Sequence, residues 1–190
     1  MQQKRLLELK APNWKEWAFT ADGSCIINKE NGSQSIGAGV YHPQSNKITT
    51  VNPGGTSNNI TISRAKLAGI AAALINEHTH IATDSAGALW LIRNSILYRQ
   101  RMKRHKHAKL LKIIVHHIQL SKYTIHLYKV KAHAGFLGNE CADAIAKCSA
   151  VNQSGHDTHI NTDARPHSSI FWPTRVENPP PCLPDTPNTF

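Results

Sequence analysis

Residues 63–89 read SRAKLAGIAAALINEHTHIATDSAGAL, and the fold class can be inferred mainly from these residues. Its first half places apolar side chains at i, i+3, i+4, i+7 and i+8, which is typical of an amphipathic helix: Leu67, Ile70, Ala71, Leu74 and Ile75. A short apolar run at 80–83 then leads into Asp84, and a second helical pattern covers about 85–96. A helix, a buried strand and a helix in succession predict an α/β fold.

The sequence before this stretch predicts three antiparallel strands. The first covers 17–22 and ends at Asp22. The dipeptide Asn31-Gly32 lies between two apolar runs, which is the strongest short-range signal for a hairpin. The second strand carries Ile36, Ala38 and Val40 on one face, and the third covers 47–51.

The sequence after this stretch adds two helices and one strand. An amphipathic helix carries five apolar residues on one face: Leu110, Leu111, Ile114, Val115 and Ile118. A fifth strand is expected over 123–130, and a last helix, capped by Asn139, over 139–150. The order β-β-β-α-β-α-α-β-α predicts a five-stranded mixed sheet flanked by helices.

Charge divides the 190-residue chain into two parts. Residues 1–150 hold 20 Lys and Arg against 8 Asp and Glu, whereas residues 151–190 hold 2 against 4 and contain 7 of the 10 prolines. We therefore expect an N-terminal extension at 1–15, a basic domain at 16–150 and a largely disordered, Pro-rich tail at 151–190. The excess of positive charge on the domain favours polyanionic partners.

The cysteines and the apolar runs bear on the setting of the protein. Cysteines at 25, 141, 148 and 182 form no CxxC pair and are too few for a secreted disulfide scaffold, so we expect reduced thiols and an intracellular protein of the cytoplasm or nucleus. The longest apolar run, at 68–75, is too short to span a bilayer, and the N-terminus has no signal peptide pattern. We expect a monomer that does not associate with membranes.

Three aspartates lie at element boundaries of the predicted fold. Asp22 and Asp84 end the first and fourth strands, and Asp143 lies in the first turns of the last helix. Helix capping and turn formation are the ordinary roles of such residues. If the carboxylates converge beyond the strand ends, they repel one another unless cations lie between them, and oxygen ligands suit Mg²⁺ or Mn²⁺ better than zinc.

Four motifs together resemble those of the ribonuclease H type 1 domain. They are FTADGSC at 19–25, SRAKL at 63–67, IATDSAGAL at 81–89 and VKAHAGFLGNECADAIAK at 130–147. The likeness covers roughly residues 17–150 and is greatest to the version found in polyproteins of non-LTR (LINE-type) retrotransposons. It implies a ribonuclease H-like fold and a nuclease that cuts the RNA strand of RNA–DNA hybrids with two divalent ions, Mg²⁺ or Mn²⁺.

The resemblance also implies roles for individual residues. Asp22 would bridge both ions, while Asp84 and Asp143 would each hold one. His133 would assist proton transfer or product release. Residues beside these positions in the matched motifs are expected to contact nucleic acid, which would be recognised by groove shape and 2′-hydroxyl groups: Gly23, Ser24 and Ser63.

One position departs from the family pattern. The family has a fourth acid, a Glu in RAEL, where this chain has Lys66 in RAKL. After a cap at Ser63, Glu would complete a capping box, which Lys cannot do. An ammonium ~4 Å from a divalent ion would also be repelled by several kcal/mol at an effective dielectric near 20.

We therefore expect Lys66 to swing away or lose its proton, and the first metal site to be weak or empty. This leaves open two other functions. The chain could be a catalytically impaired module that binds hybrid or double-stranded nucleic acid, or a retroelement fragment with no retained role.

A basic segment lies between two predicted helices. Residues 95–112 contain seven Lys and Arg and no acid. Such a run can be a solvated helix face, or it can bind a nucleic acid backbone. We expect the second role, with contacts from Arg101, Arg104 and Lys106.

Overall fold

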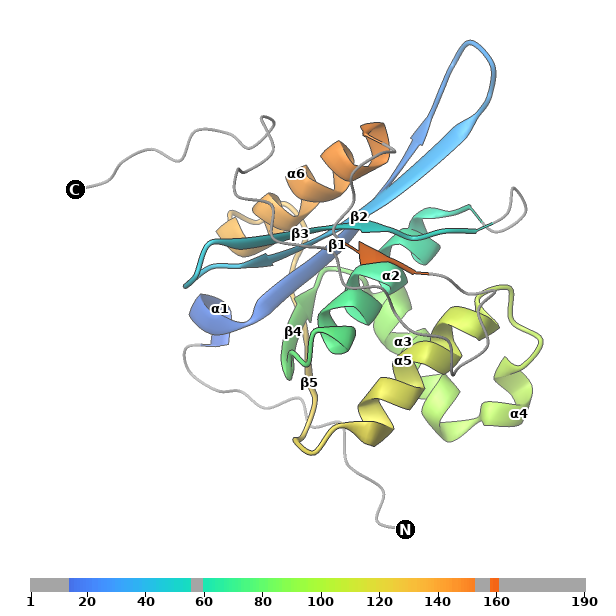
Figure 1. Ribbon diagram of the computed structural model, residues 1–190, viewed down its shortest axis with the longest axis vertical. Helices are drawn as coiled ribbons and strands as arrows, with labels where there is room; N and C mark the ends of the chain where they lie inside the picture. Colours follow the sequence, from blue (N-terminus) through green and yellow to red (C-terminus); the bar gives the residue numbers. More distant parts are fainter. Residues whose placement is uncertain (1–13, 56–59, 153–157, 161–190) are drawn as a thin grey trace.

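The computed structural model describes residues 14–55, 60–152 and 158–160. In these residues a mixed sheet carries helices on both of its faces (Figure 1). The elements are, in chain order, α1 (Trp14–Trp17), β1 (Phe19–Ile27), β2 (Gln34–His42), β3 (Lys47–Asn52), α2 (Ile62–Ile75), β4 (His80–Thr83), α3 (Ala86–Leu97), α4 (Arg99–Met102), α5 (Ala108–Leu120), β5 (His126–Lys129), α6 (Leu137–Val151) and β6 (Thr158–His159). None of these helices is long and apolar enough to cross a membrane.

The sheet has the strand order β5-β4-β1-β2-β3-β6, with β1 near its centre. β1 to β3 form the predicted antiparallel meander, while β4 and β5 extend the sheet in parallel on the other side of β1. The predicted α/β fold with a mixed sheet is confirmed.

A sixth strand differs from the five that the sequence predicts. β6 pairs in parallel with β3, and the Ile160 N–H donates to the Asn52 carbonyl at 2.9 Å. Ile160 is buried because it joins the core beside α2. The tail at 151–190, which the sequence predicts to be largely disordered, thus contributes a short strand, while 153–157 and 161–190 lie outside the described residues.

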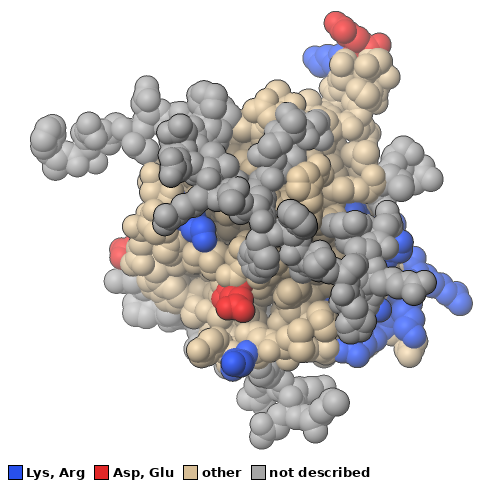
Figure 2. Space-filling view, in the orientation of Figure 1, with Lys and Arg blue, Asp and Glu red and all other residues tan. Residues whose placement is uncertain are grey.

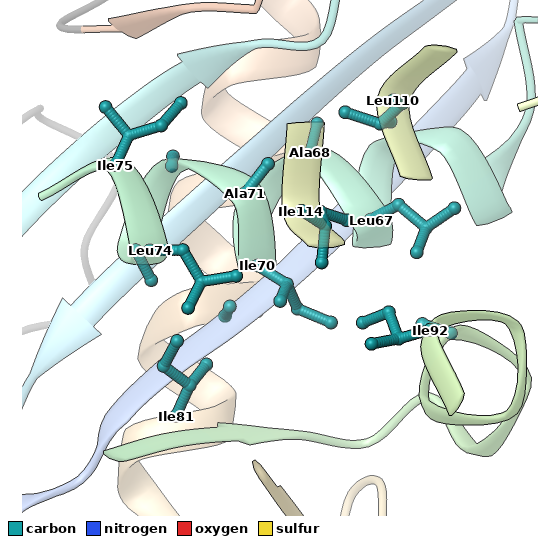
Figure 3. Close-up of a cluster of buried hydrophobic side chains, with 14 of the residues drawn as sticks. Leu67, Ala68, Ile70, Ala71, Leu74, Ile75, Ile81, Ile92, Leu110 and Ile114 are labelled. Carbon is teal, nitrogen blue, oxygen red and sulfur yellow. The ribbon is translucent and has the colours of Figure 1, made fainter. Parts of the chain in front are cut away.

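The helices divide into two layers (Figure 1). α6 covers one face of the sheet over β1, β2 and β3, and α2 lies on the other face with α3 and α5 outside it. Figure 3 shows the core on the α2 side of the sheet, where Ile70 and Leu74 of α2 face Ile81 of β4, and Ile114 belongs to α5. The sheet and α5 enclose α2 from opposite sides, so it is buried nearly all round and is not the amphipathic helix that its spacing predicts.

Several element ends differ from the sequence prediction. The side chain of Thr61 caps α2 by accepting the Arg64 N–H at 3.2 Å, which places Ser63 inside the helix. α6 begins after Phe136, so Asn139 is a buried residue of its first turn and not its cap. β5 begins only at His126, because the chain before it is held in a turn by the Ser121 hydroxyl.

The cysteines are not all reduced. Cys25 and Cys141 are free, and Cys141 of α6 is buried in a cluster with Tyr41, as expected for a core residue. Cys148 is disulfide-bonded, so the expectation of a free thiol is wrong there. The intracellular setting inferred from reduced thiols loses the support of this residue.

A buried histidine precedes α5. His107 is 1 % exposed, and its Nε2 lies 3.2 Å from the Thr61 hydroxyl at the start of α2. Burial lowers its pKa to about 4, and the charges of His105, Lys106 and Arg64 act in the same direction. The folded protein therefore holds this ring neutral where the unfolded chain would protonate it.

We expect this histidine to make the folded state weaker in acid. Because its pKa is lower in the folded than in the unfolded state, its contribution is complete above about pH 6.5 and is lost as the pH falls towards 4. His107→Gln, which does not titrate, should therefore lose less stability than the wild type over this range in thermal unfolding. If the difference in unfolding midpoint between the wild type and His107→Gln stays constant from pH 7 to pH 4, this expectation is contradicted.

Candidate active site

The site begins with a close contact between α2 and β1. A Cβ atom at position 23 would lie 2.3 Å from the backbone carbon of Ala65 and 2.3 Å from the backbone nitrogen of Lys66. One turn further along the helix, a Cβ at Gly69 would lie 3.0 Å from the Asp22 carbonyl oxygen. Glycine at both positions lets the helix backbone rest on the strand, and this contact holds Lys66 beside Asp22.

Two aspartates of neighbouring parallel strands meet at this contact. Asp22 lies in the middle of β1, not at its end as predicted, because β1 continues pairing with β2 as far as Ile27. Asp84 directly follows β4. Ser85 caps α3 by accepting the Ala88 N–H at 3.1 Å, so neither aspartate has the capping role that is ordinary for this residue type.

Lys66 joins the two aspartates. Its Nζ lies 2.7 Å from Asp22 Oδ1 and 2.5 Å from Asp84 Oδ1. The three side chains are largely buried, with exposed fractions of 17 % for Lys66, 4 % for Asp22 and 9 % for Asp84. The Gly23 N–H donates a further hydrogen bond to Asp22 Oδ1 at 2.7 Å.

The cluster keeps the proton on Lys66. Burial lowers the pKa of Lys66, but the hydrogen bonds and charges of Asp22 and Asp84 outweigh it, so this pKa lies above its ordinary value. Burial raises the pKa of Asp22, and Asp84 adds to this, while Lys66 opposes it. Lys66 thus points into the cluster in this structure and does not swing away, because two carboxylates hold the ammonium in place, while its behaviour beside a divalent ion stays a prediction.

Among the described residues, neither of the other two predicted catalytic residues makes a hydrogen bond or ion pair with this cluster. Asp143 is half-buried on α6, and its carboxylate pairs with Lys147 one turn further along at 2.6 Å. His133 is exposed in the loop before α6 and has a positive φ of 49°. The contacts among described residues thus join Asp22, Lys66 and Asp84, while the roles of Asp143 and His133 stay predictions.

The donor set does not fit the two divalent ions that the resemblance implies. Asp22 and Asp84 supply oxygen atoms suited to Mg²⁺ or Mn²⁺, but the Oδ1 atoms that converge both accept from the Lys66 ammonium. Within the described ranges, no group of three or more His, Cys, Asp or Glu side chains is placed to hold a metal ion. An incoming ion would have to displace Lys66 from both carboxylates.

The predicted nucleic acid contacts beside the aspartates have different surroundings. Gly23 is buried under α2, and its N–H bonds to Asp22, so the structure gives it a packing role, and its contact with nucleic acid stays a prediction. Ser24 is 8 % exposed, which also leaves little surface for a ligand. Ser63 is exposed on the first turn of α2, and its contact stays a prediction.

The basic segment is exposed around α4. Arg101 lies in this short helix, Arg104 and Lys106 lie in the turn after it, and all three are exposed. Figure 2 shows Lys and Arg gathered where α4 lies in Figure 1. The exposed basic residues of this segment thus form a localised patch of positive charge. We call it the α4 patch, and it consists of Arg99, Arg101, Lys103, Arg104, Lys106 and Lys109.

Arg64 is a structural residue that the sequence did not reveal. Its side chain is 1 % exposed, and it donates from Nε to the Gly54 carbonyl at 2.6 Å and from Nη2 to the Pro53 carbonyl at 3.0 Å. It thereby fixes the chain after β3 to α2. Nothing in the spacing around RAKL separates a buried arginine from a surface one.

Comparisons with known proteins agree with this architecture. The pattern of the RNase H family matches residues 15–151. A solved structure described as LC9-RNase H1, a type 1 RNase H with the type 2 active-site motif, is similar with a TM-score of 0.53 and 24 % identity over 72 % of each chain. An identity this low supports the fold alone. None of the curated protein sequences matches the chain.

The contact of α2 with β1 can be tested by adding one methyl group. Gly23→Ala should destabilise the fold by about 1–3 kcal/mol, because the new Cβ meets backbone atoms that cannot move without shifting α2. Gly87→Ala is the matched control, since a Cβ there meets nothing within 4 Å in helix α3. Denaturant unfolding of the two variants should differ clearly, and equal stabilities would contradict the packing role of Gly23.

Proposed function

Because the chain belongs to the RNase H family, we propose that it binds RNA–DNA hybrids and that its cleavage of the RNA strand is held low by Lys66. The family acts on such hybrids and generally uses divalent metal ions. The observation that carries the proposal is the pair of contacts from Lys66 Nζ to Asp22 and Asp84. These contacts tie up two of the three carboxylates that the resemblance assigns to metal binding.

Hybrid binding is supported by the α4 patch. The cations of the patch are exposed, and the chain has no Asp or Glu between Asp84 and Glu140. The patch can therefore neutralise backbone phosphates without competition from carboxylates that are near it in the sequence. Contacts to phosphates position a duplex but do not read its bases. We propose that recognition is by backbone and groove shape, which the altered metal site leaves intact.

A second candidate function is binding without any cleavage. The contacts of Lys66 favour this function. A protonated ammonium has no acceptor atom, so it removes one metal ligand completely and does not merely make that ligand weaker. The two functions separate in one experiment: hybrid cleavage that appears as Mg²⁺ or Mn²⁺ is raised supports a weak nuclease. Binding with no cleavage at any concentration supports the second function.

Three finer assignments belong to the same proposal. The motif at 130–147 supports a relationship to the LINE-type version of the domain. We propose that the protein acts as a monomer, and that it meets its hybrids in the cytoplasm or nucleus. Size determination by light scattering and localisation of a tagged chain test the last two.

We expect Lys66→Glu to raise Mg²⁺-dependent cleavage of a labelled hybrid at least tenfold. The change removes the ammonium and restores the carboxylate that the family has at this position. Asp22→Asn in the same background is the control and should abolish the gain, because it removes an acid assigned to the same site. No gain of cleavage over the wild type would overturn the role given to Lys66.

We expect Arg101→Gln/Arg104→Gln/Lys106→Gln to weaken hybrid binding to a similar extent for all sequences. The salt dependence of binding should flatten by up to about one unit of slope for each phosphate that is no longer neutralised. The control removes the same charge elsewhere on the surface, in Lys15→Gln/Lys29→Gln/Lys122→Gln. If both triple variants bind equally well at low salt, the α4 patch is not the binding surface.

A further inference from the structure

We infer that Lys66 is a cation supplied by the protein itself, which replaces a bound metal ion between Asp22 and Asp84 and holds the two carboxylates together without a divalent metal. This inference concerns the folded protein without nucleic acid. It can therefore fail or hold separately from the proposed action on hybrids.

The ammonium occupies the position that a bridging cation would take. Nζ contacts the Oδ1 atom of each aspartate at 2.7 and 2.5 Å, so it lies between the two carboxylates and not to one side of them. Two carboxylates from adjacent parallel strands would repel each other without a cation there. The sequence predicts that a metal fills this place, and in the structure a side chain does.

The backbone of Lys66 also holds this cation in place. α2 rests directly on β1 at Gly23 and Gly69, which fixes the start of the Lys66 side chain beside Asp22. A charge tethered in this way is present at a high effective concentration, because it does not have to enter the site from solution. A metal ion from solution would have to displace the Lys66 ammonium from both carboxylates, and the displaced ammonium would stay close by and repel the ion.

Burial strengthens the cluster further. The three side chains are at least four-fifths buried, so water does not screen their charges as it does at the surface. Removing one partner from such a cluster is far more damaging than removing an exposed partner. Lys147 and Asp143 provide the comparison, because their nitrogen and oxygen atoms are similarly close, at 2.6 Å, but the lysine is 60 % exposed.

The experiment compares thermal unfolding in EDTA and in Mn²⁺, using the full chain. In EDTA, Lys66→Met should lower the unfolding midpoint by on the order of 10 °C, since it leaves two buried carboxylates uncompensated. Lys147→Met, the exposed control, should change it by less than about 2 °C. Asp22→Asn/Lys66→Met/Asp84→Asn, with no charges, should regain much of the loss.

The second measurement is Mn²⁺ binding, which is monitored through the decrease in the electron paramagnetic resonance signal of free Mn²⁺. The wild type should have the same midpoint in EDTA and Mn²⁺ and should bind no ion at this site. Lys66→Met and more strongly Lys66→Glu should bind Mn²⁺ and be stabilised by it, because the ion then fills the vacated place.

Two results would overturn the inference. One is a wild-type protein that binds Mn²⁺ and is stabilised by it, with both effects lost in Asp22→Asn. The other is a Lys66→Met variant as stable in EDTA as Lys147→Met. If Lys66→Met does not fold, the wild-type Mn²⁺ titration still decides the question.

Discussion

The structure depends on the direct contact of α2 with β1, because every other feature of the site is placed by it. Glycine at positions 23 and 69 removes the side chains that would separate helix and strand. The helix can then be buried almost entirely, with the sheet beneath it and α5 outside it. The same contact brings a lysine near the start of α2 within bonding distance of two aspartates. Packing and electrostatics are thus coupled in this part of the core.

Much of the fold could be predicted from the sequence, because its signals are local. The hairpin at Asn31-Gly32, the helical spacing in 63–89 and the apolar face of α5 each depend on neighbouring residues. β6 could not be predicted, since it forms only by pairing with β3, which lies far earlier in the chain. The helix starts also differ from the prediction: Asn139 is buried in the first turn of α6, and the Thr61 side chain caps α2 two residues before Ser63.

The members of the site could be predicted, but its chemistry could not. The aspartates follow from the strand pattern and the motifs, and the need for a cation between them follows from charge repulsion. In the sequence-based prediction that cation is a metal, so Lys66 is expected to be expelled from the site. The structure resolves the same repulsion by keeping the lysine, and its backbone position beside Gly23 is what makes this possible. Distances of this kind are set by packing and are not encoded in spacing.

The short strand β6 has a consequence for the border of the sheet. It covers β3 at Val51 and Asn52, whose backbone groups would otherwise face outward. Unpaired strand borders are templates on which other chains add strands and aggregate. A chain ending at Val151 would retain the whole stretch matched to the family, yet it would leave this border open. Residues 158–160 thus protect this border from pairing with other chains, and the smallest form of the domain with the border closed extends at least to Ile160.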